Sequence, residues 1–387
     1  MEVSLATSDF MVLLAGAIAP AAVTSFLVVA LLRRWAPKLG LLDQPGERKV
    51  HAKVVPLGGG VGIWAGLILP FAVGTGVLYS LMAYQVRPSW CPEWAWTHVA
   101  GIGDRMDSLW VVLAAATILM FLGLADDRYH LNWKFRLGVQ FLVAIFCVLW
   151  QDLGFSAFIH WKWFTQIVAV IWIVSMINAF NMLDNMDALS GGIGGIVCLL
   201  LGTVMLLNRE AGSSQPQLFV AGLVFVLFGA ILGFLFHNRP PAQIFMGDAG
   251  SYLIGFTLSV ATLLGTYADS QSNPLAVLTP LFVMAVPMYD MLTVIVIRIR
   301  SGKSPFEADK NHLSHRLVEL GFTKVGAVAT IYLLTATCGL GAVLLHRLDT
   351  VGVLVVTAMV GCVLALIAVL EVTARRQARR QDSRSGT

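Results

Sequence analysis

Charged residues are scarce in this sequence. Asp, Glu, Lys and Arg make up 12% of its 387 residues, whereas hydrophobic residues make up 57%. Soluble globular proteins carry roughly 25% charged residues, so this chain has too little polar surface to enclose its core in water. The same shortage excludes an intrinsically disordered chain, in which charge is high and hydrophobicity is low. The composition therefore predicts a membrane-embedded protein.

Paired cysteines are also lacking. The five cysteines stand singly at positions 91, 147, 198, 338 and 362, most of them in apolar runs. Their spacing matches no metal site and suggests no disulfide framework. The sequence contains no histidine-based zinc motif, no P-loop and no glycine-rich nucleotide fingerprint. We expect no nucleic-acid partner.

Long apolar runs, in contrast, recur along the whole chain. A membrane-spanning helix needs about 20 mostly apolar residues. We therefore predict an all-α polytopic integral membrane protein with about eleven transmembrane helices, forming one domain over residues 1–387. The predicted spans are 9–32, 60–83, 108–124, 137–154, 163–180, 189–207, 217–236, 251–268, 274–297, 324–346 and 350–371.

Basic residues are distributed unevenly between the two sides that these spans define. One side receives 21 of the 26 Lys and Arg residues, including those of the basic tail 372–387. Because cytoplasmic loops carry an excess of Lys and Arg, we predict that the N-terminus is outside and the C-terminus cytoplasmic. The tail would contact the anionic headgroups of membrane lipids.

Polar sequence is concentrated in five segments, and the predicted topology places all of them on the cytoplasmic side. The segments are 43–60, 126–134, 178–189, 237–251 and 305–316. A topology with one span missing would send half of them to the opposite face. Their convergence therefore predicts a single site at the cytoplasmic membrane surface.

Acidic and amide side chains in these segments suit a metal ion. Asp126 and Asp127 end an apolar helix, where consecutive side chains point about 100° apart, so the two carboxylates cannot face one ligand equally. One can face a cation or an acceptor, while the other takes a nearby Lys or Arg. Four more candidates recur every three residues and would form one polar stripe on a helix: Asn178, Asn181, Asp184 and Asp187. The oxygen atoms of their carboxylates and amides suit Mg²⁺, which prefers hard oxygen ligands. The alternative explanation for these four residues is that they cap a helix and form turns.

Two further acids stand next to or inside apolar spans. Asp248 lies in PheMetGlyAspAlaGlySer, just before span 251–268. At a helix N-terminus, a carboxylate and backbone N–H groups can meet one phosphate–metal unit. Asp290 lies inside span 274–297, about two turns before Arg298. A carboxylate at membrane depth is usually functional or paired, and both roles are open for Asp290.

Basic residues and imidazoles accompany these acids. The segment 305–316 contains Lys310, His312, His315 and Arg316, and a second cluster contains Arg48, Lys49, His51 and Lys53. The first group would bind a multiply charged anion such as a sugar diphosphate. The second would suit the phosphate of a lipid whose tail stays in the membrane. Together with hard-cation ligands, they indicate phosphoryl transfer involving a lipid.

In their order and on one face, the five segments resemble those of the polyprenyl-phosphate N-acetylhexosamine-1-phosphate transferases, glycosyltransferase family 4. The resemblance covers roughly residues 40–320. ProPhe…Asp…HisLeuSerHisArg (305–316) is similar to the branch that transfers GlcNAc-1-phosphate, whereas the phospho-MurNAc-pentapeptide branch carries a three-histidine run. The resemblance implies a multi-pass enzyme of the bacterial cytoplasmic membrane that depends on Mg²⁺, with Mn²⁺ as an alternative. The resemblance is also compatible with a homodimer.

The implied reaction moves N-acetylhexosamine-1-phosphate from a UDP-sugar, with UDP-GlcNAc favoured, to undecaprenyl phosphate, and releases UMP. It would be the first membrane step of a cell-envelope polysaccharide. The implied catalytic residues are Asp126, the candidate base, with Asp127 and Asp248, and the implied metal ligands are Asp248 and Asn181. The implied substrate contacts are Lys53 at the lipid phosphate, Asp184, Asp187, Asn238 and Phe245 on the nucleotide side, and His312, His315 and Arg316 at the sugar or diphosphate.

Two features depart from the family pattern. Ser314 stands where a histidine is usual, which leaves the identity of the sugar open. AspAsnMetAspAla (184–188) replaces the commoner Asp-Gly-x-Asp-Gly, so that Asn185 and Ala188 stand at glycine positions. Neither departure removes an implied metal ligand.

Functions of other classes remain as alternatives. A transporter or lipid flippase with an ion site would have polar residues spread through several spans and broken helices in matched halves. A membrane scaffold would leave the acid-rich segments unexplained. Within the family, another UDP-N-acetylhexosamine donor is the alternative.

Overall fold

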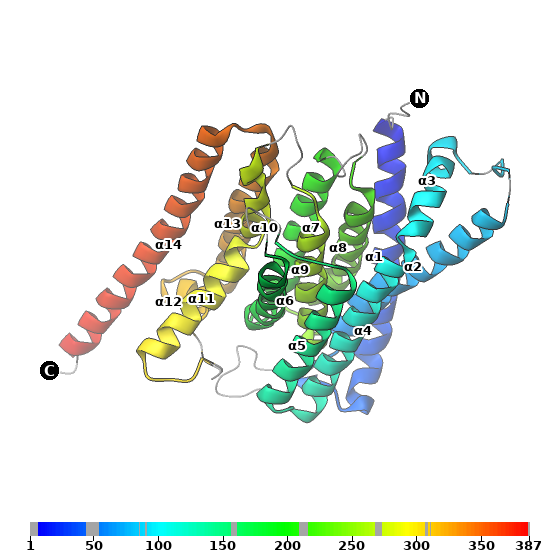
Figure 1. The fold of residues 1–387 in the computed structure, drawn as a ribbon. Helices are drawn as coiled ribbons and strands as arrows, with labels where there is room; N and C mark the ends of the chain where they lie inside the picture. Colours follow the sequence, from blue (N-terminus) through cyan, green and yellow to red (C-terminus); the bar gives the residue numbers. More distant parts are fainter. Residues whose placement is uncertain are drawn as a thin grey trace.

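The computed structural model describes residues 7–43, 54–84, 86–89, 91–155, 161–208, 216–267, 273–305, 309 and 311–385. Over these ranges the chain forms a bundle of helices (Figure 1), which confirms the predicted all-α class. The α-helices are α1 (Thr7–Leu39), α2 (Gly59–Ala83), α3 (Glu93–Asp104), α4 (Met106–Tyr129), α5 (Trp133–Trp150), α6 (Lys162–Leu183), α7 (Leu189–Leu207), α8 (Leu218–Asn238), α9 (Gly247–Leu264), α10 (Thr279–Val283), α11 (Ala285–Arg300), α12 (Leu313–Glu319), α13 (Lys324–Leu344) and α14 (Thr350–Ser385). The described chain also contains two 3-10 helices, η1 (Pro274–Leu278) and η2 (Leu345–Arg347), and an antiparallel strand pair, β1 (Leu42–Asp43) and β2 (Val55–Pro56).

Most of these helices are suited to cross a bilayer. Within the described ranges, nine helices are long and apolar enough to do so, and a tenth span results if η1, α10 and α11, which bend by 65°, are counted as one. The predicted span 251–268 falls on α9, which is not among them. This helix begins four residues earlier than expected and carries Asp248 in its first turn.

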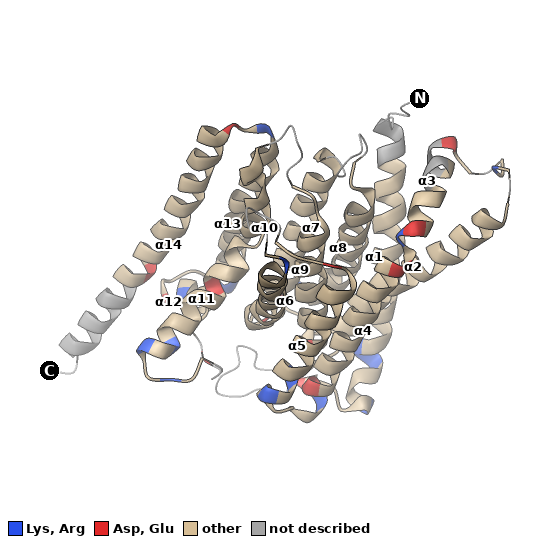
Figure 2. Ribbon diagram, in the orientation of Figure 1, with Lys and Arg blue, Asp and Glu red and all other residues tan. Residues whose placement is uncertain are grey.

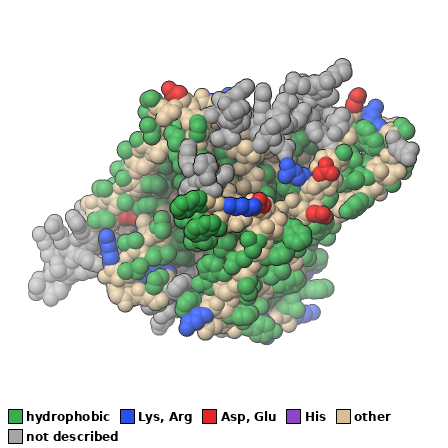
Figure 3. All heavy atoms as spheres, in the orientation of Figure 1, with side chains coloured by type: hydrophobic (Ala, Val, Ile, Leu, Met, Phe, Trp, Pro, Cys, Tyr) green, Lys and Arg blue, Asp and Glu red, His purple; other side chains and the backbone are tan. Residues whose placement is uncertain are grey.

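Apolar side chains are widespread on the face of the bundle that Figure 3 shows. On α5, Leu142, Phe146 and Trp150 are each more than half exposed, and large apolar residues of α14 are equally open. So many exposed large apolar side chains are unfavourable in water but match the hydrocarbon of a bilayer. The protein is a multi-pass membrane protein.

Helix α9 lies at the centre, packed against α2, α4 and α6, and almost all of its residues are buried. Its first turn approaches its neighbours at glycines. A β-carbon on Gly60 of α2 would lie 2.1 Å from the backbone nitrogen of Gly250, and one on Gly123 of α4 would lie 2.4 Å from the backbone of Asp248. Backbone–backbone contact therefore fixes where Asp248 stands.

Lys and Arg gather at the end of the bundle where α1, α4 and α11 finish (Figure 2). Helix α1 begins at the opposite end, whereas α14 finishes at the basic end (Figure 1). Because the chain starts at one end of the bundle and finishes at the other, this arrangement agrees with an odd number of membrane crossings. Helix α14 continues to Ser385, so most of the predicted tail 372–387 lies on this helix.

Candidate active site

Asp248, in the first turn of α9, is the centre of a polar cluster. Its Oδ1 accepts a 2.6 Å hydrogen bond from Nδ2 of Asn181 on α6. Its Oδ2 lies 3.3 Å from Nη1 of Arg136 on α5 and 3.4 Å from the hydroxyl of Tyr252, one turn further along α9. Three helices thus contribute side chains that converge on one carboxylate.

The two adjacent acids at the end of α4 have different partners. The Asp127 carboxylate caps α9, because its Oδ1 accepts a 2.9 Å hydrogen bond from the backbone N–H of Asp248. Negative charge at this position is favoured by the helix dipole. Asp126 instead forms an ion pair with Arg136 and accepts a 2.7 Å bond from the backbone N–H of Leu131. The prediction that the two carboxylates face different groups is confirmed.

The predicted polar stripe of four residues on α6 is wrong. Asn181 points toward Asp248, but Asn178 donates to Gln140 of α5 at 2.7 Å and to the carbonyl of Val174 at 2.8 Å. The other two members, Asp184 and Asp187, follow the end of α6 at Leu183 and lie in a turn. The spacing of three residues places side chains on one face only while the helix continues, and here it stops halfway.

Asp184 adds a further carboxylate near the start of α9. It accepts a hydrogen bond from the backbone N–H of Gly247. Burial, followed by repulsion from Asp127, raises the pKa of Asp184 to about 8. The part of this shift that comes from Asp127 shows that carboxylates gather at this position, and a bound cation would offset their mutual repulsion.

The donor set suits a magnesium ion that keeps much of its hydration. Within the described ranges, no three Asp, Glu, His or Cys side chains form a ready-made metal site. Asp248 offers a carboxylate, and Asn181 offers an amide oxygen because its nitrogen makes the bonds to Asp248 and Ser251. Mg²⁺ is commonly held by one or two protein oxygens together with water and substrate phosphates. Asp248 and Asn181 therefore fit the predicted ion.

The predicted nucleotide-side residues meet where the turn after α6 contacts the loop before α9. Asp187 accepts a 2.9 Å hydrogen bond from the backbone N–H of Ala242. Asn238 accepts from the N–H of Ala188 at 2.8 Å and donates to the carbonyl of Ile244 at 2.9 Å. These side chains therefore join the two loops.

The loop before α9 is also joined to the first polar segment. The N–H of Phe245 donates to the carbonyl of Pro56 in β2, and its carbonyl accepts from the N–H of Gly59, both at 2.9 Å. The structure thus brings the backbone of Phe245 beside the segment that leads into α2. Lys53 lies outside the described residues.

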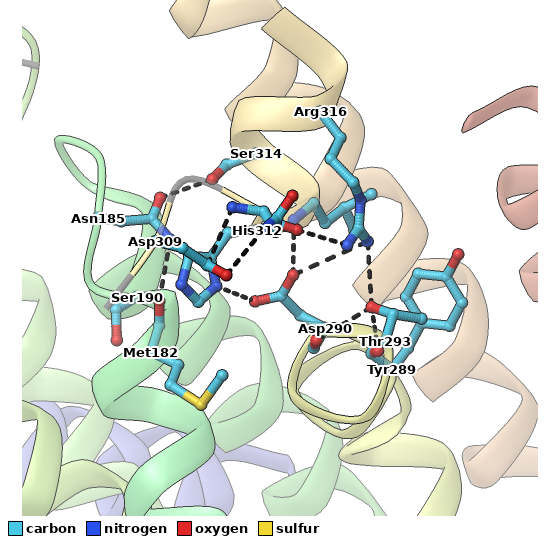
Figure 4. Close-up of polar contacts among 12 residues, drawn as sticks. Met182, Asn185, Ser190, Tyr289, Asp290, Thr293, Asp309, His312, Ser314 and Arg316 are labelled. Carbon is cyan, nitrogen blue, oxygen red and sulfur yellow. Dashed lines mark hydrogen bonds and ion pairs between the residues drawn. The ribbon is translucent and has the colours of Figure 1, made fainter. Parts of the chain in front are cut away.

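The buried carboxylate of Asp290 on α11 holds the start of α12 (Figure 4). It accepts a 2.8 Å hydrogen bond from Nδ1 of His312 and a 2.5 Å bond from the backbone N–H of Leu313. The Arg316 guanidinium lies 4.0 Å away. Asp290 is therefore paired, which is one of the two roles that the sequence left open. Its partners belong to α12 and its N-cap, not to the basic end of its own helix.

Arg298 pairs with Asp309 instead. Its Nε and Nη2 contact the two carboxylate oxygens at 3.1 and 3.2 Å. Burial raises the pKa of Asp309, but hydrogen bonds from Arg298 and Asn311 outweigh it and hold the pKa at about 2. Asp309 therefore stays ionised, and this pair ties the loop before α12 to the end of α11.

Arg316 is buried, with its donors directed at groups of the protein. Nη1 donates to the carbonyl of Asn311 at 2.6 Å, and Nη2 donates to Thr293 at 3.1 Å. Nε lies 3.0 Å from the carboxylate of Glu371 on α14. Its role as a sugar or diphosphate contact stays a prediction. His315 is half-buried on the same helix, with its ring centre 6.5 Å from that of His312.

Tyr252 and Glu371 are among the residues of these clusters that the sequence analysis missed. Tyr252 stands four residues after Asp248, and this helical spacing was a usable signal. Glu371 is the last residue of the predicted span 350–371, and an acid that ends an apolar run was a usable signal.

Ala188, at a usual glycine position, has a left-handed backbone with φ 63°. This conformation costs an ordinary residue roughly 1–2 kcal/mol and costs glycine little. We expect Ala188→Gly to raise the free energy of unfolding by about 1 kcal/mol, part of the gain being offset by the freer unfolded chain. Thermal unfolding in detergent measures the change.

The matched control is Asn185→Gly in the same turn. Asn185 has a negative φ, and its side chain forms hydrogen bonds, so this substitution should lower the melting temperature. Equal effects of the two glycine substitutions would show that the left-handed backbone of Ala188 stores no strain.

The structure is a membrane-embedded bundle that gathers carboxylate, amide and guanidinium groups at one end. Glycosyl transferase family 4 matches residues 109–266, which contain Asp126, Asn181 and Asp248. The chain is 31% identical over 330 residues to the "Probable undecaprenyl-phosphate N-acetylglucosaminyl 1-phosphate transferase" of Bacillus subtilis (strain 168), covering 83% of this chain and 82% of the relative. It is 31% identical over 333 residues to the "Undecaprenyl-phosphate alpha-N-acetylglucosaminyl 1-phosphate transferase" of Yersinia pestis, with coverage of 84% and 81%. The protein of the same name from Escherichia coli (strain K12) is 30% identical over 325 residues, with coverage of 81% and 78%. The chain belongs to glycosyl transferase family 4.

Proposed function

We propose that the protein transfers GlcNAc-1-phosphate from UDP-GlcNAc to undecaprenyl phosphate and releases UMP. The observation that carries the proposal is the cluster around Asp248, which lies in the segment shared with the family. The names of the relatives supply the acceptor and the sugar phosphate. The apolar surface of the bundle suits an acceptor whose tail stays in the membrane.

In the proposed reaction, an oxygen of the lipid phosphate attacks the β-phosphorus of UDP-GlcNAc. The bond from this phosphorus to the oxygen bridging the two phosphates breaks, and UMP leaves with that oxygen. Asp248 and Asn181 would hold Mg²⁺ or Mn²⁺, which when bound supplies positive charge to the diphosphate. The negative charge gathered around Asp248 supports this assignment.

Asp126 is the proposed base, and Arg136 the group that controls it. The two form an ion pair, and Arg136 also reaches Asp248. A lipid phosphate that enters the site can replace Asp126 as the partner of the Arg136 guanidinium, because Arg binds phosphate through two parallel hydrogen bonds. The exchange leaves Asp126 free to accept a proton from the acceptor. Asp127 keeps α9 in place throughout.

We further propose eleven spans, with the site at the cytoplasmic face of the bacterial inner membrane. The gathering of Lys and Arg beside the site supports this orientation. In this arrangement α9 is counted as a span in addition to the ten described above. The polar start of α9 is tolerated because protein surrounds it. Single cysteines at Tyr84 and Asn132, at opposite ends of the bundle, should react with an impermeant maleimide from opposite sides of sealed vesicles.

The transporter alternative is less well supported. It predicts polar groups spread through several spans, whereas the acids around Asp248 stand at helix ends and Asp290 is bound to α12. The deciding experiment incubates purified protein with radiolabelled UDP-GlcNAc, undecaprenyl phosphate and Mg²⁺. A lipid-linked product with release of UMP is expected. Product with another UDP-sugar alone would change the donor, and no product with any UDP-sugar would overturn the proposal.

Metal removal should abolish the reaction. We expect EDTA to reduce transfer to background, because the carboxylates around Asp248 and the substrate phosphates would repel one another without a cation. Excess Mg²⁺ should restore transfer fully, and Mn²⁺ should support it. The measurement is product formation over a titration of free metal. Undiminished transfer in EDTA would contradict the assignment of Asp248 and Asn181 as ligands.

A further inference from the structure

Two parts of the proposed donor site are joined by one side-chain contact. The hydroxyl of Ser314, in the first turn of α12, donates a 2.6 Å hydrogen bond to Oδ1 of Asn185, in the turn between α6 and α7 (Figure 4). The two residues are 129 positions apart in the sequence. Asn185 is itself fixed, because its Nδ2 donates to the carbonyl of Met182 at 2.9 Å.

The contact is well defined on both sides. Ser314 is buried, with 1% of its surface exposed, and the preceding residue Leu313 is bound through its N–H to Asp290. Asn185 is half-buried and stands between Asp184 and Asp187. The bond therefore connects a turn that carries predicted nucleotide-side residues to the helix that carries predicted sugar-side residues.

Asn185 and Ser314 are also two of the positions at which the sequence departs from the family pattern. A glycine at 185 offers no side chain, whereas a histidine at 314 has a longer one. In this chain a longer residue on the turn faces a shorter residue on α12, and the two are in hydrogen-bond contact.

We propose that Asn185 and Ser314 form a latch that sets the spacing of the donor site and thereby its affinity for the UDP-sugar. The proposal rests on the proposed function. A donor that spans from the turn to α12 binds well only when these two parts are held at the right distance. The lipid phosphate, which binds at Asp126 and Arg136 in the proposed reaction, does not depend on this spacing.

A double-mutant cycle tests the latch through the KM values of both substrates. Asn185→Ala should raise the KM for UDP-GlcNAc by about tenfold, because the buried Ser314 hydroxyl loses its partner. Ser314→Ala should raise it by only about threefold, because water can reach the half-buried amide of Asn185. The double variant should be no worse than Asn185→Ala. The KM for undecaprenyl phosphate should stay unchanged in all three.

Paired exchange gives a second test. Asn185→Gly and Ser314→His should each raise the KM for UDP-GlcNAc, and the variant with both substitutions should return to within about threefold of wild type. The control is Ser190→Ala, which removes a buried 3.1 Å hydrogen bond to Phe180 within the α6–α7 unit. It should lower the melting temperature without changing the KM for either substrate.

Additive effects in both cycles, or equal rises in the two KM values, would overturn the latch. The melting temperatures of the same variants, measured in detergent without substrate, must also show coupling between positions 185 and 314. This measurement does not depend on which UDP-sugar is the donor. A wild-type protein that is inactive with every UDP-sugar would overturn the proposed function. Coupling in the melting temperatures would then still support the contact, and additive melting temperatures would overturn it as well.

Discussion

Replacing Asp248 with Asn is expected to reduce kcat by on the order of 1000-fold, the loss seen when one preorganised electrostatic contact to a transition state is removed. The variant keeps the shape of the side chain and the contact with Asn181, and the backbone N–H of residue 248 still donates to Asp127. What disappears is the negative charge that we propose holds the metal. Radiolabel transfer at saturating substrates measures the effect.

Metal binding can be followed separately from turnover. Because a ligand that binds only the folded state stabilises it, Mg²⁺ should raise the melting temperature of the wild type but not of the Asp248→Asn variant. The matched control is Asp152→Asn, which removes an exposed carboxylate paired with Lys162 at 2.7 Å. This control should transfer like wild type. Normal turnover by Asp248→Asn would remove Asp248 from the site.

The sequence predicted the components of the site better than their contacts. Hydropathy located the helices, and the basic bias placed the polar segments at one end. Asp126, Asp127 and Asp248 could be found because each interrupts an apolar run. Their distinct roles could not, because the cap on α9 depends on the left-handed backbone of Gly247, which brings Asp127 against the next N–H groups.

Where a helix ends also decided what could be predicted. The stripe on α6 was expected from a spacing of three residues, but α6 stops at Leu183 and the chain then turns. Asp187 consequently binds the loop before α9, not the metal cluster. Periodicity describes a helix only between its caps, and no strong stop signal such as proline marked this end.

Long-range pairing was the least accessible to sequence. A basic residue at the end of its own helix was one candidate partner for Asp290, but Arg298 follows eight residues later, about 12 Å further along the helix axis. Arg298 meets Asp309 in the next loop, and Asp290 meets His312. Partners contributed by another helix depend on tertiary packing, which one sequence without an alignment does not report.

Replacing Asp290 with Ala is expected to destabilise the protein by about 3–5 kcal/mol and to abolish transfer, because it removes one partner of a buried charged cluster. The N–H of Leu313, Nδ1 of His312 and the guanidinium of Arg316 would all lose the carboxylate. The yield of folded protein in detergent and its melting temperature measure the first effect. Asp349→Ala is the control, since this exposed carboxylate only accepts a bond from the N–H of Gly352 at the start of α14 and should cost about 1 kcal/mol.

The isosteric variant Asp290→Asn separates position from stability. Its amide oxygen can still accept from the N–H of Leu313, which keeps α12 in place, but its NH₂ group cannot accept from Nδ1 of His312. Should His312 contact the donor, this variant will fold and show a raised KM for UDP-GlcNAc with an unchanged KM for undecaprenyl phosphate. If Asp290 serves only to anchor α12, Asp290→Asn will be close to wild type in both KM values, and the Asp290–His312 bond then has no part in donor binding.

The variant Glu371→Gln distinguishes Arg316 from His312, the two side chains that face Asp290. Arg316 also contacts Glu371, so this substitution weakens the contact that holds Arg316 and leaves the Asp290–His312 bond intact.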